Sequence, residues 1–420
     1  MYFIYSILYT TAVIILLIPQ CFKRPSGLRL TWLREKLGFP AMTGREDKGS
    51  ARSFWVHAVS VGEVMAAVPF LHLLRSSYPG SPVILSTMTD TGRAVAEAKA
   101  PVGVRVVYMP FDSFCITKHF LRRINPLLFI IVETEIWPNA IRAAHVQGIP
   151  VIMVNGRISE NSFRRYKKIS GFMKRVLSRG TLYLMQTGDD AERMRLMGAE
   201  EKKIIVSGSF KFDCPERPAI PPWATRLKGP VIVAGSTHTG EEELMIAALR
   251  KNLDLVPALK LVLAPRHPER FNEVEALVKA SGLSFVRRTQ FDKAGGEERA
   301  DSHIIILDSI GELASVYGIA DIAVIGKSFS GQGGQNPLEA ALWGKAILCG
   351  PHMENFPFIS VFYKEGAAFE VSSEGLAEKI RELLEAPSMI REAGEKASML
   401  YVKNSGAVVS SFEAVKQCIH

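Results

Sequence analysis

The sequence predicts an α/β protein with two Rossmann-like domains, one after the other along the chain. Short apolar segments of strand length alternate with longer amphipathic segments of helical length over almost the whole chain. The alternation stops once, in a proline-rich stretch at residues 214–222, and then begins again. The chain has 420 residues, which is enough for two domains that each have a core.

Seven of the apolar segments precede the proline-rich stretch and five follow it. The first seven are Phe54–His57, Val83–Leu85, Val104–Val107, Leu127–Val132, Val151–Val154, Leu182–Met185 and Ile204–Val206. The other five are Val231–Ala234, Leu261–Ala264, Ile304–Leu307, Ile322–Ile325 and Ala346–Leu348. Largely apolar strands that alternate with helices form parallel sheets with helices on both faces. We therefore expect a first domain at residues 22–214, a linker at 215–222 and a second domain at 223–420.

The N-terminal segment is predicted to be a membrane anchor. Residues 2–19 carry no charge and are close to the minimum length that crosses a bilayer. They lack the basic start and the small-residue cleavage site of a secretory signal peptide. The basic residues that follow are Lys23, Arg24, Arg29, Arg34 and Lys36. Their position favours an anchor at residues 1–21 with the rest of the chain in the cytoplasm, and a buried helix of a soluble domain is the alternative.

The composition limits the kinds of molecule and ion that the protein is expected to bind. The net charge of +9 is compatible with nucleic acid, an anionic membrane surface or a phosphorylated substrate. No segment interleaves basic and aromatic residues as nucleic-acid-binding motifs do, so no nucleic acid partner is expected. The five cysteines are scattered, without a Cys-x-x-Cys pair or a histidine cluster. Neither a disulfide framework nor a metal site is therefore expected.

Charged residues follow several strands of the predicted first domain. Ligands of open α/β sheets bind beyond the carboxyl ends of the strands. Glu63 follows the first strand near a helix start, where a carboxylate acts as a general base or only as a cap. Glu133 and Glu135 follow the fourth strand, where a buried carboxylate needs a partner or a substrate. Lys211 precedes the linker and either meets an anionic group or is solvated.

The glycine-rich segment 331–339 is predicted to bind an anion in the second domain. Asn336 can cap a helix, Pro337 suits its first position, and Glu339 falls three residues after the cap. The order of strand, glycine loop and helix N-terminus presents N–H groups to a phosphate. The alternative is that the glycines only turn the chain. Polar loops at residues 235–242, 265–269 and 308–313 also follow strands, and we expect them to converge on the same edge of the sheet.

Five motifs carry a resemblance to a known family. They are His57-Ala58-Val59-Ser60-Val61-Gly62-Glu63, Glu133-Thr134-Glu135-Ile136-Trp137-Pro138-Asn139, Gly208-Ser209-Phe210-Lys211-Phe212-Asp213, Pro265-Arg266-His267-Pro268-Glu269-Arg270-Phe271 and Asn336-Pro337-Leu338-Glu339. Together with the N-terminal anchor they resemble the 3-deoxy-D-manno-octulosonic acid (Kdo) transferases of lipopolysaccharide synthesis over nearly the whole chain. The resemblance implies a GT-B fold, with two Rossmann-like domains facing across a cleft and an N-terminal transmembrane anchor.

The resemblance also implies a reaction and a location. An inverting glycosyltransferase would move Kdo from CMP-Kdo to a lipid A precursor, lipid IVA, at the cytoplasmic side of a Gram-negative inner membrane. A single-pass signal-anchor would hold the enzyme beside that membrane. The basic residues that could meet anionic headgroups are Arg164, Arg165, Lys167 and Lys168. These side chains also fit a solvated helix face. The rival function is that of another GT-B glycosyltransferase, with a UDP-sugar as donor.

The roles of individual residues follow from the resemblance alone. Glu63 would be the catalytic base, and Glu133 and Lys211 would stabilise the transition state. The choice of Glu133 over Glu135 rests on the alignment of one motif, so the two remain interchangeable. The residues implied to bind CMP are Arg266, His267, Ile310, Gly311, Glu312, Asn336, Pro337, Leu338 and Glu339. No cofactor and no metal are implied.

Overall fold

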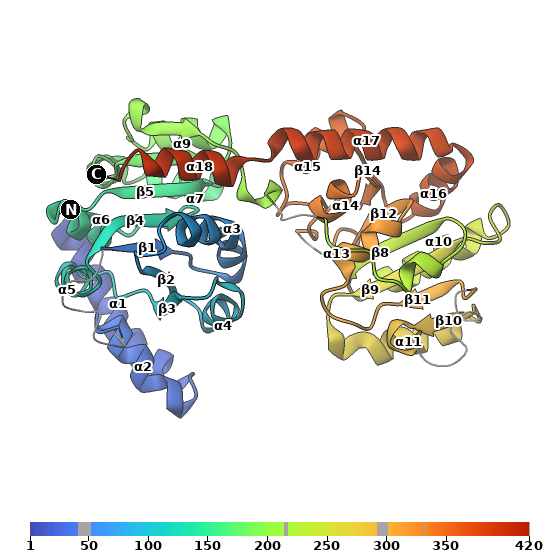
Figure 1. The fold of residues 1–420 in the computed structure, drawn as a ribbon, viewed down its shortest axis with the longest axis horizontal. Coiled ribbons are helices and arrows are strands. Elements are labelled where there is room, and N and C mark those ends of the chain that lie inside the picture. Colours follow the sequence, from blue (N-terminus) through green and yellow to red (C-terminus); the bar gives the residue numbers. More distant parts are fainter. Residues whose placement is uncertain (41–51, 214–216, 292–300, 332, 420) are drawn as a thin grey trace. The chain divides into compact units, whose positions relative to one another are not determined.

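The protein divides into two compact units. The structure, a computed structural model, describes residues 1–40, 52–213, 217–291, 301–331 and 333–419. The first unit comprises residues 1–214 and 404–420, and the second comprises residues 215–403. Each unit contains a seven-stranded sheet (Figure 1).

The sheet of the first unit has the strand order β3-β2-β1-β4-β5-β6-β7, and neighbouring strands run parallel. The strands are β1 (Ser53–His57), β2 (Val83–Thr87), β3 (Val104–Tyr108), β4 (Pro126–Val132), β5 (Val151–Gly156), β6 (Leu182–Met185) and β7 (Ile204–Val206). All seven apolar segments predicted for this half are strands. Their apolar side chains allow burial on both faces, as a parallel sheet requires.

Helices cover both faces of this sheet. Along β1 the side chains alternate in direction, so Phe54 and Val56 enter one apolar cluster and Trp55 enters another. The first cluster includes residues of α3 (Val61–Ser77), α4 (Asp90–Lys99) and α18 (Ala407–Lys416). The second includes residues of α5 (Phe114–Ile124), α6 (Pro138–Val146) and α8 (Ser170–Leu177). The remaining elements are α7 (Glu160–Lys167), α9 (Gly188–Leu196), η2 (Glu201–Lys203) and η3 (Phe210–Phe212).

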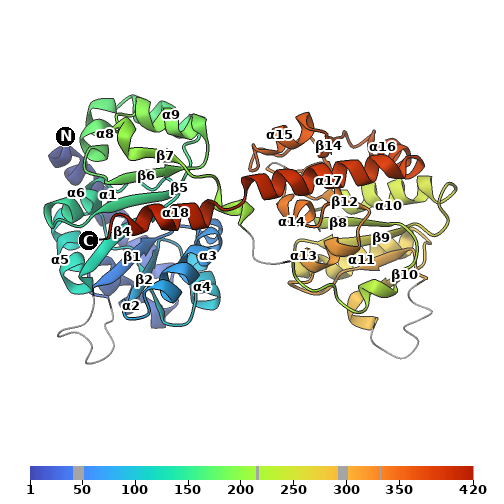
Figure 2. The ribbon, with the colours of Figure 1, turned by 45° about the horizontal axis from the view of Figure 1, so that its top comes forward.

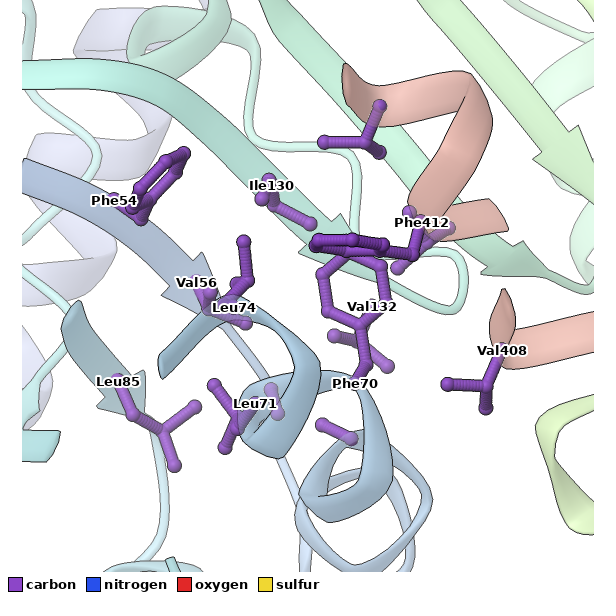
Figure 3. Packing of buried hydrophobic residues seen from close by; sticks show 14 of the residues in the cluster. Phe54, Val56, Phe70, Leu71, Leu74, Leu85, Ile130, Val132, Val408 and Phe412 are labelled. Atoms are coloured by element: carbon purple, nitrogen blue, oxygen red, sulfur yellow. The ribbon is translucent and has the colours of Figure 1, made fainter. Parts of the chain in front are cut away.

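The C-terminal helix α18 belongs to the first unit (Figure 2). Its Val408 and Phe412 are buried against the face of the sheet that α3 covers, and the ring of Phe412 lies 6.1 Å from that of Phe70 (Figure 3). The prediction that the second domain extends to residue 420 is therefore wrong. The sequence shows that α18 has an apolar face, but it does not show which of the two cores buries that face.

The predicted linker is only partly described. Residues 214–216 lie outside the described part of the chain, and residues 217–222 belong to the second unit. Arg217 donates to the carbonyl oxygen of Leu342 at 2.9 Å, and its guanidinium lies 5.6 Å from the ring centroid of Trp343. The proline-rich stretch thus packs on the second unit after residue 216 and does not act as a free spacer there.

The sheet of the second unit is also parallel, with the order β10-β11-β9-β8-β12-β13-β14. Its strands are β8 (Val231–Thr237), β9 (Lys260–Pro265), β10 (Phe285–Arg287), β11 (Ile304–Ile306), β12 (Ile322–Ile325), β13 (Ala346–Cys349) and β14 (Ala368–Glu370). The five predicted segments are strands. The edge strands β10 and β14 were not predicted, because three residues are too few to show an apolar pattern.

Helices of the second unit include α10 (Glu241–Asn252), α11 (Phe271–Ala280) and α16 (Leu376–Glu385), which contribute to one buried cluster with the sheet. The other elements are η4 (Ala224–Arg226), η5 (Pro268–Arg270), η6 (Arg288–Gln290), α13 (Leu313–Val316), η7 (Tyr317–Ile319), α14 (Leu338–Leu342), α15 (Ile359–Lys364) and α17 (Pro387–Asn404). Of these, η6 begins directly after β10.

The N-terminal segment forms α1 (Tyr2–Phe22), followed by α2 (Ser26–Lys36). Helix α1 is long and apolar enough to cross a membrane, and none of its residues is fully buried. A helix in the core of a soluble domain would have buried residues. The exposed apolar surface of α1 is compatible with a membrane anchor.

We predict that Phe412→Ala destabilises the first unit alone, by about 3–5 kcal/mol, because it leaves a cavity in a buried cluster. Hydrogen exchange measured by mass spectrometry should show faster exchange in β1, β4 and β5 and no change in β8, β9 and β12. Val409→Ala is the matched control, because Val409 is 56% exposed on the same helix. Faster exchange in the second sheet, or an equal effect of the control, would contradict the assignment of α18.

Candidate functional site

Three glutamates and two cations lie at the carboxyl ends of strands of the first sheet. Glu63 follows β1, Glu133 and Glu135 follow β4, and Arg157 follows β5, while Lys211 lies in η3 shortly after β7. Because all these strands are parallel, the loops that follow them lie at one edge of the sheet. Their charges act on one another, as the pKa shifts of the glutamates show. We call these five residues the acidic cluster.

Glu63 lies in the first turn of α3 and is half-buried. Its Oε2 accepts a hydrogen bond from Val59 N at 2.6 Å, and its Oε1 accepts one from Ser60 Oγ at 3.1 Å. Burial raises the pKa of Glu63 to about 7, and the charge of Glu133 contributes to the increase. The side chain therefore closes the loop as a cap does and also has the pKa of an effective general base near neutral pH.

Glu133 and Glu135 face different charges, although they are two residues apart. Burial raises the pKa of Glu133, and the charges of Lys211 and Arg157 oppose this increase. Burial also raises the pKa of Glu135, to about 7, and here Glu63 and Glu133 add to the increase. The structure thus places Glu133, and not Glu135, among the cations. Glu133 has φ of 59°, a left-handed conformation that costs energy for a residue with a side chain.

Lys211 and Arg157 are held by hydrogen bonds from neighbouring loops. The buried Asn155 accepts a hydrogen bond from Phe210 N at 3.0 Å through its Oδ1, which ties the turn of Lys211 to the end of β5. Thr134 Oγ1 accepts from Arg157 N at 2.9 Å. Burial lowers the pKa of Lys211, and Glu133 opposes this effect. Neither Asn155, which lies near the end of β5, nor Arg157, which directly follows that strand, was identified from the sequence.

A neutral histidine fixes the loop that carries Glu133 and Glu135. Trp137 Nε1 donates to His57 Nε2 at 3.1 Å. An indole N–H only donates, so His57 Nε2 is the acceptor and its Nδ1 carries the proton that it donates to Ser86 O at 3.0 Å. Burial lowers the pKa of His57 to about 3. His57 is therefore an uncharged link between β1, β2 and the loop after β4.

A separate pocket of about 320 Å³ lies at the strand ends of the second unit. Its lining includes four of the residues that the resemblance implies for CMP: Arg266, Gly311, Asn336 and Glu339. Ser236, Tyr317 and Gln335 also line it, and none of the three was predicted individually as a nucleotide-binding residue. The signal for Ser236 and Gln335 was their place in loops already identified as polar. Tyr317 follows the short helix α13, where the sequence carries no comparable signal.

Glu339 and Arg266 give this pocket both an anionic and a cationic group. Burial raises the pKa of Glu339, and the charge of Arg266 opposes the increase. A carboxylate accepts hydrogen bonds from sugar hydroxyls, and a guanidinium binds phosphate oxygens with two parallel N–H groups. The pair can therefore hold the ribose and the phosphate of a nucleotide.

The glycine-rich loop differs from the predicted anion cradle. Gly333 N donates to Glu354 Oε2 at 2.7 Å and Gly334 N donates to Lys327 O at 3.2 Å, so neither N–H is free. The cradle prediction is wrong for these two residues, while Gln332 lies outside the described residues. Both glycines have positive φ, of 100° and 64°, which favours glycine at these positions.

The helix after this loop begins one residue later than predicted. Helix α14 starts at Leu338, with Pro337 at the N-cap position. Asn336 Oδ1 still satisfies the helix end, because it accepts from Leu338 N at 3.1 Å. No described hydrogen bond joins Glu339 to this cap, so its carboxylate remains available to the pocket.

The other residues implied for CMP do not line the pocket. His267 and Ile310 are exposed, and Pro337 and Leu338 are buried. Glu312 forms an ion pair with Arg288 at 2.9 Å.

Two buried glutamates brace the loops around this pocket. Glu241 accepts hydrogen bonds from His238 N at 2.9 Å, Lys327 N at 2.7 Å and Phe329 N at 3.0 Å, which joins the loop after β8 to the loop after β12. Glu242 forms a two-point ion pair with Arg270, at 2.8 and 3.2 Å. These acidic side chains hold the protein backbone and Arg270, so their role in the loop at residues 235–242 is structural.

No group of three or more His, Cys, Asp or Glu side chains in the described part of the chain is arranged to hold a metal ion.

Comparison with known proteins identifies the family. Residues 31–214 match the family model described as 3-deoxy-D-manno-octulosonic-acid transferase (kdotransferase). The 3-deoxy-D-manno-octulosonic acid transferase of Haemophilus influenzae is 31% identical over 393 residues, which cover 91% of this chain and 90% of the relative. The chain belongs to the Kdo transferase family. The Kdo transferase of Bordetella pertussis is 35% identical over 322 residues, which cover 73% of each chain.

Solved structures support the fold of this Kdo transferase family member. The crystal structure of MurG from Acinetobacter baumannii superposes with a TM-score of 0.55 over 87% of this chain and all of that one, at 11% sequence identity. At this identity the likeness shows the fold alone. The predicted GT-B fold, the resemblance to the Kdo transferases and the prediction of a glycosyltransferase are confirmed.

We predict that Glu133→Gln lowers the pKa of both Glu63 and Glu135, because the charge of Glu133 raises both in the wild type. Carboxyl ¹³C resonances followed through a pH titration measure the change. Glu160→Gln is the control, because Glu160 lies on α7 in an exposed pair with Arg164. An unchanged pKa of Glu63 in Glu133→Gln would show that the glutamates are not coupled.

Proposed function

We propose that this glycosyltransferase moves Kdo from CMP-Kdo to a lipid A precursor, lipid IVA, with inversion at the anomeric carbon. The observation that carries the proposal is the acidic cluster. In this cluster the pKa of Glu63 is about 7 and is raised in part by the charge of Glu133, while the charge of Lys211 acts on Glu133. An acceptor hydroxyl needs a base, and a departing nucleotide needs a cation. The family and the motif resemblance support the choice of sugar, donor and acceptor.

Glu63 is the general base of this proposal. Its hydrogen bonds from Val59 N and Ser60 Oγ orient the carboxylate, and its raised pKa makes it a stronger base than a solvated glutamate. The acceptor hydroxyl transfers its proton to Glu63 as its oxygen attacks the anomeric carbon of Kdo. The bond from that carbon to the CMP phosphate breaks in the same step. One direct displacement of this kind inverts the configuration.

Lys211 and Glu133 act on the charges of the transition state. Negative charge grows on the phosphate oxygen of CMP as it leaves, and the ammonium of Lys211 stabilises it. Positive charge develops on the sugar ring at the same time, and the carboxylate of Glu133 stabilises that charge. Burial increases both effects, because water screens charges less in a low-dielectric site.

The donor nucleotide binds to the pocket of the second unit in this proposal. Glu339 accepts hydrogen bonds from the ribose hydroxyls, and Arg266 binds the phosphate. Asn336 and Gly311 line the same pocket and contact the remainder of CMP. No contact with CMP is proposed for five residues that the resemblance implies, because they do not line this pocket: His267, Ile310, Glu312, Pro337 and Leu338.

Helix α1 is the inner-membrane anchor of this proposal, with both units on the cytoplasmic side. Because Tyr5 and Tyr9 bind Asp112 of the first unit, α1 enters the bilayer through its exposed apolar face and does not cross it as a single-pass helix. Its exposed apolar surface and the basic residues that follow it support this orientation. Anchoring places the enzyme beside a lipid acceptor that does not leave the bilayer.

We predict that Glu63→Gln reduces turnover by about 10²–10⁴-fold, because the amide cannot accept the proton of the acceptor hydroxyl. The assay is transfer from CMP-Kdo to a tetra-acylated lipid A precursor in detergent, with the product resolved by mass and CMP binding measured by calorimetry. CMP binding should be unchanged. Glu97→Gln, on the exposed side of α4, is the control and should behave as the wild type.

Two results would contradict this account of Glu63 and the donor. Near-normal turnover of Glu63→Gln would remove Glu63 as the base. Consumption of a UDP-sugar by the wild type, with no consumption of CMP-Kdo, would favour the rival glycosyltransferase function.

We predict that Glu339→Gln weakens CMP binding roughly 10- to 100-fold, because a neutral amide loses charge-assisted hydrogen bonds from the ribose. Calorimetry with CMP measures the dissociation constant without turnover. Glu378→Gln, on the exposed face of α16, is the matched control. Equal affinity of Glu339→Gln and the wild type would place the nucleotide elsewhere.

A further inference from the structure

A second and larger pocket lies between the N-terminal helices and the body of the first unit. Its volume is about 600 Å³, within the range of pockets that enclose small ligands. Helix α1 contributes Val13, Leu16 and Leu17 to its lining, and Trp32, Phe111 and Trp137 contribute aromatic surface. The lining is predominantly apolar, so it suits a hydrocarbon chain.

Helix α1 is held at this position by polar contacts of its first turns. Tyr5 Oη donates to Asp112 Oδ2 at 2.7 Å, and Tyr9 Oη accepts from Asp112 N at 3.1 Å. Asp112 is buried and also accepts from Ala140 N at 2.7 Å, at the start of α6. Tyr2 packs edge-on against Phe172, with ring centroids 5.1 Å apart. These contacts fix the position of α1, which forms one wall of the pocket.

One buried ammonium group in the pocket, that of Lys36, forms no ion pair with any of the described residues. Lys36 is 3% exposed, and its Nζ lies 3.3 Å from Met88 Sδ. The carboxylates nearby are already paired, since Asp90 binds Arg24 at 2.9 Å and Glu35 binds Arg93 at 2.6 Å. No ion pair of Lys36 occurs among the described residues. Burial of an unpaired ammonium is costly, and an anion in the pocket would offset that cost.

The pKa of Lys36 reflects its burial beside a second cation. Burial lowers the pKa of Lys36 to about 7, and Arg24 lowers it further while Asp90 and Glu35 oppose this. Arg24 also lines the pocket, with its guanidinium 4.3 Å from the ring centroid of Trp32. Two cations thus border an apolar pocket that holds one carboxylate, that of Asp90.

We propose that this pocket holds one acyl chain of the lipid acceptor, with a phosphate of the same lipid beside Lys36 and Arg24. The proposal rests on the proposed function, which makes the acceptor a phosphorylated lipid. The apolar lining matches the chain, and the two cations match the phosphate. Other apolar residues of α1 point away from the body of the unit, with Phe3 77% and Ile15 66% exposed. The bilayer can contact them, so a lipid chain can enter beside α1 without crossing water.

The pocket is continuous with the loops that carry the acidic cluster. Trp137 lines the pocket, binds His57 and lies two residues after Glu135. On the other side Met88 lines the pocket and its N–H donates to Val59 O at 3.3 Å, while Val59 N binds Glu63. A lipid held here would have its headgroup close to the proposed base.

The first test locates the acyl chain without turnover. A lipid IVA analogue with a diazirine near the end of one acyl chain is photolysed with the full-length protein in detergent, and the labelled peptides are identified by mass spectrometry. We expect labelling in residues 12–17 and around Phe111. Ala12→Trp fills the pocket from α1 and should reduce labelling to background. Ile15→Trp, on the same helix but outside the pocket lining, should leave it unchanged.

The second test concerns the phosphate. Lys36→Met keeps the side-chain length but removes the charge, so it should raise the KM for phosphorylated lipid IVA roughly 10- to 100-fold, with kcat nearly unchanged. With a dephosphorylated acceptor, Lys36→Met and the wild type should have equal KM. Lys99→Met, at an exposed position of α4, is the control.

The outcomes separate this proposal from the proposed function. Labelling outside the pocket, or unchanged labelling of Ala12→Trp, overturns the acyl-chain site even if Kdo transfer is normal. An unchanged KM of Lys36→Met for the phosphorylated acceptor overturns the phosphate contact. A wild type that transfers no Kdo but is labelled in the pocket contradicts the proposed function and supports the lipid site.

Discussion

The parallel pairing of strands is the constraint on which this protein depends. In each unit all seven strands of the sheet run in the same direction, so the loops that leave their carboxyl ends gather at one edge. This brings Glu63, Glu133, Arg157 and Lys211 together from four distant parts of the chain. In the second unit the same rule joins Arg266, Gly311 and Asn336 in one pocket. The chemistry of both sites follows from where the strands end.

Burial changes the pKa values of the charged groups in both candidate sites. Three carboxylates and two cations share one partly buried region of the first unit, and burial raises the pKa of each glutamate. Backbone and hydroxyl donors orient Glu63, while Asn155 and Thr134 hold the loops of Lys211 and Arg157. The left-handed conformation of Glu133 is part of the cost of this arrangement.

The sequence predicts the sheets well, because apolar segments such as Leu127–Val132 are typical of strands that are buried on both faces. It also locates Glu63, Glu133 and Lys211, because each is charged and follows a strand. It misses the unit to which α18 belongs, because Phe412 would fit either core. It misjudges the glycine loop, because Gly333 N is bound by Glu354, a residue whose proximity arises only from the fold. The pocket beside α1 is likewise made by contacts between distant segments, such as Tyr5 with Asp112.

The most direct test of the central claim is the pH dependence of kcat/KM for Kdo transfer to the lipid acceptor. Burial raises the pKa of Glu63 to about 7, so the base is protonated at lower pH and ionised at higher pH. We predict that kcat/KM rises with pH, by about tenfold per unit below pH 7, and then levels off as the coupled glutamates ionise. A rate that is constant between pH 5 and pH 8, or that falls over this range, would contradict the assignment of Glu63 as the base.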